Sequence, residues 1–128
     1  MTLLVDTNVL LLWVYDPARL SARAHAALRS GENRLLWSVA STWEVAIKVG
    51  LGKLRLDGPV GEVLPAELLR HEIGLLPIAN HHALRVADLP AIHGDPFDRL
   101  IFAQALVEGI ALVTADTRAA AYGVAVVW

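Results

Sequence analysis

The feature that most constrains the fold is the apolar run at residues 3–5, which stops abruptly at Asp6, Thr7 and Asn8. A short apolar run bounded by polar residues is typical of a strand buried on both faces, as in parallel sheets covered by helices. Asp6 then lies at the carboxyl end of this strand. Ligands of parallel α/β sheets bind at that edge, so Asp6 is the first candidate functional residue.

The composition is that of a globular protein. The chain has 128 residues, 55% of them hydrophobic, and we expect one domain that spans residues 1–128 around its own core. The net charge of −2 gives no overall basic field, so a polyanionic partner would need local cations. Cysteine is absent, which excludes a disulfide framework and a thiolate metal site and suits a reducing cytosol.

The most apolar window near the amino end, residues 9–14, is far shorter than the roughly 20 residues that a membrane-spanning helix needs. A signal peptide is not indicated either, because no basic residue precedes Arg19 and Asp6 interrupts the apolar stretch. We therefore expect a soluble, cytoplasmic protein without a membrane partner.

Strand-like and helix-like segments alternate along the chain, which predicts right-handed crossovers and a mostly parallel sheet covered on both sides. Asp6 and Asn80 are expected helix caps, and residues 51–59 an exposed connection. After the first strand, we expect strands at 34–37, 75–78, 110–114 and 124–127, and helices at 7–15, from about 21, and at 38–49, 60–72, 81–89, 96–108 and 117–122.

Four acids follow the ends of these strands: Asp6, Glu44, Asp98 and Asp116. Each lies just beyond a strand or in the first turns of the next helix, and parallel topology brings those positions to one edge of the sheet. Each also has a capping explanation. Asp6 and Asp116 suit N-cap positions, Asp98 follows an expected Asp95 cap, and residues 41–44 spell a capping box.

Capping does not account for the lack of compensating charge. No lysine lies beyond Lys53, and Arg99 and Arg118 are the only cations near these motifs in the sequence. Two carboxylates about 4 Å apart repel by roughly 4 kcal/mol at an effective dielectric constant near 20, so a cluster must protonate or bind a cation. Oxygen ligands favour Mg²⁺ or Mn²⁺, which can activate water and neutralise a phosphodiester.

Four motifs together resemble the PIN-domain family, and more narrowly the VapC-type toxins of bacterial toxin–antitoxin pairs. They are Asp6-Thr7-Asn8, the segment 37–44 with Ser38 and Glu44, the run His93-Gly94-Asp95-Pro96-Phe97-Asp98-Arg99-Leu100-Ile101, and Thr114-Ala115-Asp116. The resemblance covers nearly the whole chain, and the run at 93–101 is its most specific part.

This resemblance implies a three-layer α/β/α fold with a parallel five-stranded sheet in the order 3-2-1-4-5. It also implies a metal-dependent endoribonuclease that cuts RNA and forms a homodimer or a larger toxin–antitoxin assembly. A cognate antitoxin would silence it and would be its only link to DNA.

The resemblance also assigns roles to the acids. It implies that Asp6 and Asp98 contact the metal directly, and Asp116 directly or through water. Glu44 would orient or deprotonate the attacking water, and Asp95 would be either a fifth acid or only the cap.

Three further residues are accessory candidates. Thr7 and Thr114 would hydrogen-bond metal-bound water or phosphate, unless they only satisfy the local backbone. Arg99 would contact RNA phosphate, unless it is simply a solvated side chain.

The histidines favour plainer interpretations. Adjacent residues such as His81 and His82 do not face each other on a helix, so a helix-surface role is expected rather than a metal site. His93 is expected to be a loop residue, although its place before the acidic motif leaves substrate contact open. The tryptophans are expected in the core or an interface.

Two other functions that use clustered acids lack a residue that they require. A phosphoacceptor receiver domain needs a lysine near the last strands, and an aspartyl phosphatase needs an acid where Asn8 stands. A non-catalytic α/β binding module, whose acids only cap helices, remains the alternative.

Overall fold

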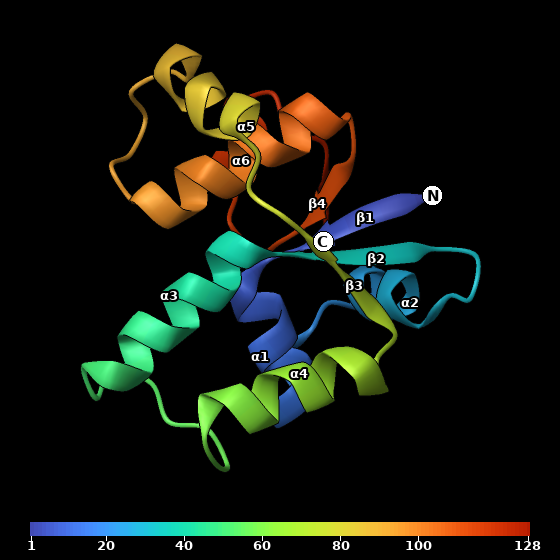
Figure 1. Ribbon diagram of the computed structural model, residues 1–128. Coiled ribbons are helices and arrows are strands. Elements are labelled where there is room, and N and C mark those ends of the chain that lie inside the picture. The colour runs from blue at the N-terminus through green and yellow to red at the C-terminus, as the bar shows by residue number, and fades with distance from the viewer.

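The computed structural model describes residues 1–128 and contains one sheet of five parallel strands in the order β3-β2-β1-β4-β5 (Figure 1). This order confirms the expected topology, with the first strand at the centre. The strands are β1 (Thr2–Val5), β2 (Arg34–Ser38), β3 (Ile73–Leu76), β4 (Ala111–Val113) and β5 (Val126–Val127).

Helices cover both faces of the sheet, as Figure 1 shows, with α5 and α6 on one side and α1, α2 and α4 on the other. This arrangement confirms the α/β class. The helices are α1 (Thr7–Tyr15), α2 (Ala22–Arg29), α3 (Val39–Gly50), α4 (Val60–Arg70), α5 (Asn80–Arg85), α6 (Pro96–Glu108) and α7 (Arg118–Ala121), with 3₁₀ turns at Pro17–Arg19 and Val86–Asp88.

Alternation along the strands divides the core into two layers. Leu3 and Val5 of β1 pack with α1, α2 and α4, whereas Leu4 packs with α6 and α7. All three side chains are fully buried. This two-sided burial explains why β1 is apolar at every position from 3 to 5, and it fixes Asp6 at the edge of the sheet.

Several predicted boundaries agree with the structure. Helices α1 and α6 have the expected limits, Asp6 is the N-cap of α1, and α6 begins with Pro96 after the Asp95 cap. The connection at 51–59 is mostly exposed, as expected.

Other boundaries were wrong. Strand β3 begins two residues earlier than expected, because Ile73 and Gly74 pair with β2, and Pro77, which has no N–H group, follows its end. The helix expected at 81–89 is instead α5 followed by a 3₁₀ turn.

Two capping predictions also failed. Ser38, not Ser41, caps α3, so Ser41 and Glu44 lie inside the helix and form no capping box. Asn80 is the first residue of α5 rather than its cap, and the backbone N–H of Ala79 donates to His82 Nδ1. His82 is therefore buried instead of lying on the helix surface.

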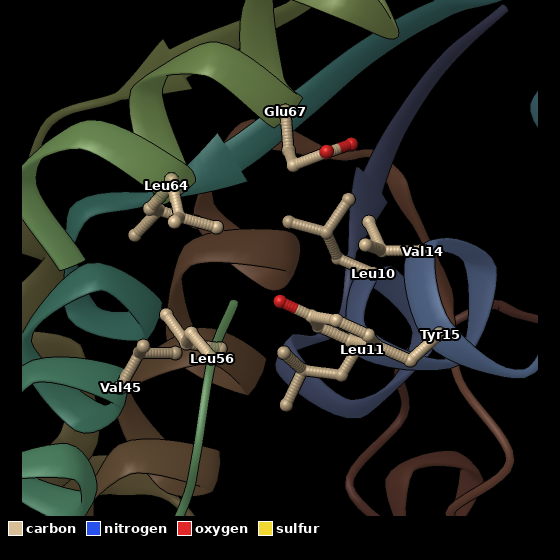
Figure 2. A pocket seen from close by; sticks show the side chains of 9 residues that line it. Leu10, Leu11, Val14, Tyr15, Val45, Leu56, Leu64 and Glu67 are labelled. Carbon is tan, nitrogen blue, oxygen red and sulfur yellow. The ribbon is translucent and has the colours of Figure 1, made fainter. Parts of the chain in front are cut away.

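The structure has no helix long and apolar enough to cross a membrane. Figure 2 shows an apolar hollow between α1, α3 and α4, lined by residues such as Leu10, Val45 and Leu64, with Glu67 at one side. Its volume of about 10 Å³ marks a packing gap, and it contains none of the four acids.

Candidate functional site

Three of the four predicted acids line one cleft of about 330 Å³. Asp6 follows β1, Asp116 lies shortly after β4, and Asp98 lies in the first turn of α6. Strands β1 and β4 are neighbours, so their carboxyl ends bring Asp6 and Asp116 to the same edge. The complete lining is Asp6, Asn8, Val9, Leu12, Asp98, Ala115, Asp116 and Arg118.

Asp6 is held by two hydrogen bonds. Its Oδ1 accepts the backbone N–H of Thr7 at 2.8 Å, and its Oδ2 accepts the Thr114 hydroxyl at 2.7 Å. Burial raises the pKa of Asp6, and the two hydrogen bonds only partly oppose that shift. Asp6 thus caps α1 and still presents a carboxylate that is costly to leave charged.

Asp98 has the most perturbed carboxyl group in the cleft. Burial raises its pKa to about 7, with further contributions from the negative charges of Asp95, Asp6, Glu44 and Asp116. Asp95 caps α6, because its Oδ1 accepts the backbone N–H groups of Phe97 and Asp98 at 2.9 and 3.0 Å. The expected cap role of Asp95 is confirmed, and it does not line the cleft.

Glu44 does not line the cleft and is almost completely buried. Its Oε1 is 2.8 Å from Thr7 Oγ1, which is also 2.8 Å from Ser41 Oγ. A carboxylate has no hydrogen to give, so Thr7 donates to Glu44, and Ser41 supplies the other contact. Lys48 Nζ lies 2.5 Å from Glu44 Oε2.

Asp116 is engaged by Arg118, the only basic residue that lines the cleft. Arg118 Nε donates to Oδ1 at 2.9 Å and Nη2 donates to Oδ2 at 3.0 Å. These bonds lower the pKa of Asp116. Thr114 links the two strand ends, because its hydroxyl donates to Asp6 and accepts the backbone N–H of Asp116.

The expectation that the four acids lack compensating charge was therefore wrong for two of them. Lys48 neutralises Glu44, and Arg118 neutralises Asp116. Lys48 lies four residues after Glu44 on the same helix, a spacing that places the two side chains on one face. The signal for this pair was present in the sequence and was missed.

His93 faces the same acids from the loop before α6. One of its ring nitrogens and carboxylate oxygens of Asp98 and Asp116 lie within 4.8 Å of one another. His93 Nδ1 accepts the backbone N–H of Asp95 at 3.3 Å, so a neutral ring carries its hydrogen on Nε2. Nε2 is buried without a hydrogen-bond partner and is a donor rather than a cation ligand.

Arg99 has a structural set of contacts. Its guanidinium donates to the carbonyl groups of Pro90, Val86 and His93 and to the Tyr122 hydroxyl. It does not line the cleft.

The side chains in the cleft suit a hard divalent cation. Asp6 and Asp98 present oxygen ligands, have raised pKa values and have no ion-pair partner of their own. A cation would stabilise their ionised forms and make the proton on Asp98 unnecessary.

A second group of possible ligands consists of His81, His82 and Glu108. His82 Nδ1 accepts a backbone N–H, so the neutral ring carries its hydrogen on Nε2, 3.7 Å from Glu108. That hydrogen leaves no free lone pair for a metal ion on His82, and the geometry favours a helix cap.

Comparison with known proteins agrees with this geometry. The sequence model of the PIN-domain family matches residues 3–125 of this chain. Ribonuclease VapC22 of Mycobacterium tuberculosis is 34% identical over 119 residues, which cover 91% of this chain and 88% of that protein.

Solved structures show the same fold at lower sequence identity. The structure of VapBC2 from Rickettsia felis bound to a DNA fragment from their promoter matches with a TM-score of 0.74 and 16% identity, covering 98% of this chain and 97% of that one. FitAcB from Neisseria gonorrhoeae matches with a TM-score of 0.63 and 23% identity, covering 97% and 95%. The chain therefore belongs to the PIN-domain family, among its VapC-type members.

Proposed function

We propose that this protein is the endoribonuclease toxin of a toxin–antitoxin pair, and that its acidic cleft holds Mg²⁺ or Mn²⁺ to hydrolyse RNA phosphodiesters. The ribonuclease activity and the toxin role follow from the family and from the VapC relative. Nucleases of this family depend on a metal ion. The observation that carries the assignment to this cleft is the convergence of Asp6, Asp98 and Asp116 on one lining, in which Asp6 and Asp98 have no ion-pair partner. Burial also raises the pKa of Asp98 to about 7, which favours a cation beside it.

In this proposal, Asp6 and Asp98 hold the ion directly, and Asp116 completes the site directly or through a water molecule. When bound, the ion lowers the pKa of a water molecule and neutralises charge on the phosphodiester. The choice of Mg²⁺ or Mn²⁺ is supported by the carboxylate ligands, because oxygen donors suit hard ions.

The remaining polar residues position these acids. Thr114 orients Asp6 through its hydroxyl and Asp116 through the backbone. Glu44 holds Thr7, the first residue of α1 and the neighbour of Asp6. Both Glu44 oxygens are already engaged, which supports a positioning role more than proton abstraction from water. Direct contacts from Thr7, Thr114 or Arg99 to substrate stay predictions.

The proposed partners follow the same logic. RNA is the substrate, a cognate antitoxin is the inhibitor, and the protein acts in the cytoplasm as a homodimer or within a toxin–antitoxin assembly. Contact with DNA would occur through the antitoxin. The Rickettsia felis complex is described as bound to promoter DNA, which supports this arrangement.

The alternative is a binding module without catalysis. Asp6 and Asp95 do cap helices, which is the observation in its favour. Capping alone gives no reason for tight binding of Mn²⁺. Calorimetry with Mn²⁺ therefore separates the two functions.

The decisive experiment compares cleavage of single-stranded RNA by the wild type, Asp98→Asn and Asp57→Asn, each with Mn²⁺ and with excess chelator. Asp57 is an exposed loop acid and serves as the matched control. We expect cleavage by the wild type and by Asp57→Asn only with metal, and a loss of at least about 100-fold in Asp98→Asn. Equal cleavage by all three proteins with and without chelator would exclude the proposed mechanism.

A further inference from the structure

Arg118 is the basic side chain in the acidic cleft, and it has no structural duty elsewhere. All of its side-chain hydrogen bonds go to Asp116, and about half of its side chain is exposed. Arg99, by contrast, is held by three backbone carbonyl groups and a tyrosine hydroxyl. Arg118 can thus change partners without breaking a hydrogen bond to any residue other than Asp116.

The pairing leaves Asp116 poorly prepared to bind a cation. Oδ1 accepts both the backbone N–H and Nε of Arg118, which uses both of its lone pairs. Oδ2 accepts Nη2 and keeps one lone pair, but an ion bound there would lie beside the guanidinium. A cation and Arg118 therefore compete for Asp116.

An RNA phosphate offers Arg118 a second partner, which would leave Asp116 available to the cation. A guanidinium binds phosphate with the same two-pronged geometry that it uses on a carboxylate. The cleft lining offers no other basic side chain to a phosphodiester. An arginine displaced from Asp116 would already lie next to the position of the substrate.

We infer that Arg118 is a substrate-binding residue that pairs with Asp116 in the free protein and moves to an RNA phosphate when a divalent cation binds Asp116. The inference rests on the proposed function, because it takes the cleft as the metal and RNA site. It assigns to one residue two opposite effects, weaker binding of the metal alone and tighter binding of RNA.

Substitution of Arg118 should separate these effects. In Arg118→Met, we expect the dissociation constant for Mn²⁺, measured by calorimetry without RNA, to fall by about fivefold. The dissociation constant for a fluorescent oligouridylate should rise by about tenfold. RNA binding is measured by anisotropy with Ca²⁺ in place of Mn²⁺, and a gel confirms that the strand is intact.

Two further variants identify the cause. Arg118→Lys keeps the positive charge but loses the two-pronged geometry of the guanidinium. Its dissociation constants for Mn²⁺ and for RNA should therefore lie between those of the wild type and Arg118→Met. Arg23→Met removes one positive charge from an exposed position on α2, outside the cleft lining, and should leave the Mn²⁺ constant unchanged. Thermal unfolding verifies that each variant is folded.

The outcomes distinguish the inference from the function on which it rests. Wild-type binding of Mn²⁺ together with unchanged or weaker Mn²⁺ binding in Arg118→Met overturns the inference alone. Unchanged RNA affinity in Arg118→Met also overturns it. Absence of Mn²⁺ binding in the wild type and in every variant overturns the proposed function itself.

Discussion

The two pairs of acids at the edge of the sheet differ in their counter-charges. Glu44 and Asp116 each have a cation from the same chain, Lys48 and Arg118. Asp6 and Asp98 have none, and burial raises the pKa of both. The fold therefore stabilises one pair of carboxylates internally and leaves the other pair dependent on a proton or an external cation.

This difference suggests a division of labour within the cleft. The ion pairs with Lys48 and Arg118 hold Glu44 and Asp116 in place without a ligand. Burial disfavours the ionised forms of Asp6 and Asp98, and a divalent ion that binds between them would stabilise those forms. Folding stability is lower as a result, which is common where a site is built for a ligand rather than for the fold.

The largest effect predicted from this comparison is a pH dependence of stability caused by Asp98. Its pKa is about 7 in the folded protein and 3.8 for an unperturbed carboxyl, so the folded state binds the proton more tightly. The free energy of unfolding should therefore fall as the pH rises from about 4 to about 7 and level off above that range. The shift corresponds to about 4 kcal/mol for a fully buried group, which solvent screening reduces to about 2 kcal/mol.

Urea unfolding in chelator across this pH range measures the effect. Asp98→Asn should flatten the curve, and Asp57→Asn, which changes an exposed acid, should keep the wild-type slope. Asp6, whose pKa is also raised, contributes in the same direction and would leave a residual slope. The same slope in Asp98→Asn as in the wild type would show that Asp98 does not cause the pH dependence of stability.

The second effect concerns the ion pair between Lys48 and Glu44. Lys48→Met leaves Glu44 buried without its cation, because Glu44 is only 4% exposed and Lys48 is its ion-pair partner. Removal of one partner from a buried pair costs several kcal/mol, and the 40% exposed lysine reduces this to about 2 kcal/mol. Urea unfolding at pH 7 measures the loss.

Glu44→Gln in the Lys48→Met protein should recover much of that loss, since the uncompensated charge disappears. Lys53→Met, at an exposed loop position, is the matched control and should change stability little. If Lys48→Met were as stable as the control, the internal neutralisation of Glu44 would have no energetic weight.

Much of this arrangement was predictable from local sequence. The apolar run before Asp6 and the Asp95-Pro96 start of α6 fixed the positions of Asp6 and Asp98 on their elements. Parallel topology then places Asp6 and Asp116, which follow β1 and β4, at the same edge of the sheet. These predictions succeeded because they depend on capping and burial, which act over a few residues.

Two of the predictions that failed depend on contacts distant in sequence. β3 starts at Ile73 because of its pairing with β2, which no local pattern around Gly74 reveals. His82 is buried because α6 packs against α5, and its Nδ1 replaces the expected Asn80 cap. The pairing of Arg118 with Asp116 required the actual turn between β4 and α7, although the two residues are close in sequence.

The smallest effect concerns the Thr114 hydroxyl, which links Asp6, an acid without an ion-pair partner, to Asp116, which is paired with Arg118. Thr114→Val removes the donor to Asp6 Oδ2, at 2.7 Å, while it preserves the size and β-branched shape of a fully buried residue. The pKa of Asp6 should rise further, because that hydrogen bond lowers it in the wild type. We expect a loss of about 1 kcal/mol in the free energy of unfolding at pH 7. The acidic limb of the pH profile for RNA cleavage should also move to higher pH. Thr117→Val, at an exposed position whose side chain forms no cap, is the matched control for stability. A Thr114→Val protein with the wild-type acidic limb would show that Asp6 is held by its backbone contact and the metal ion alone.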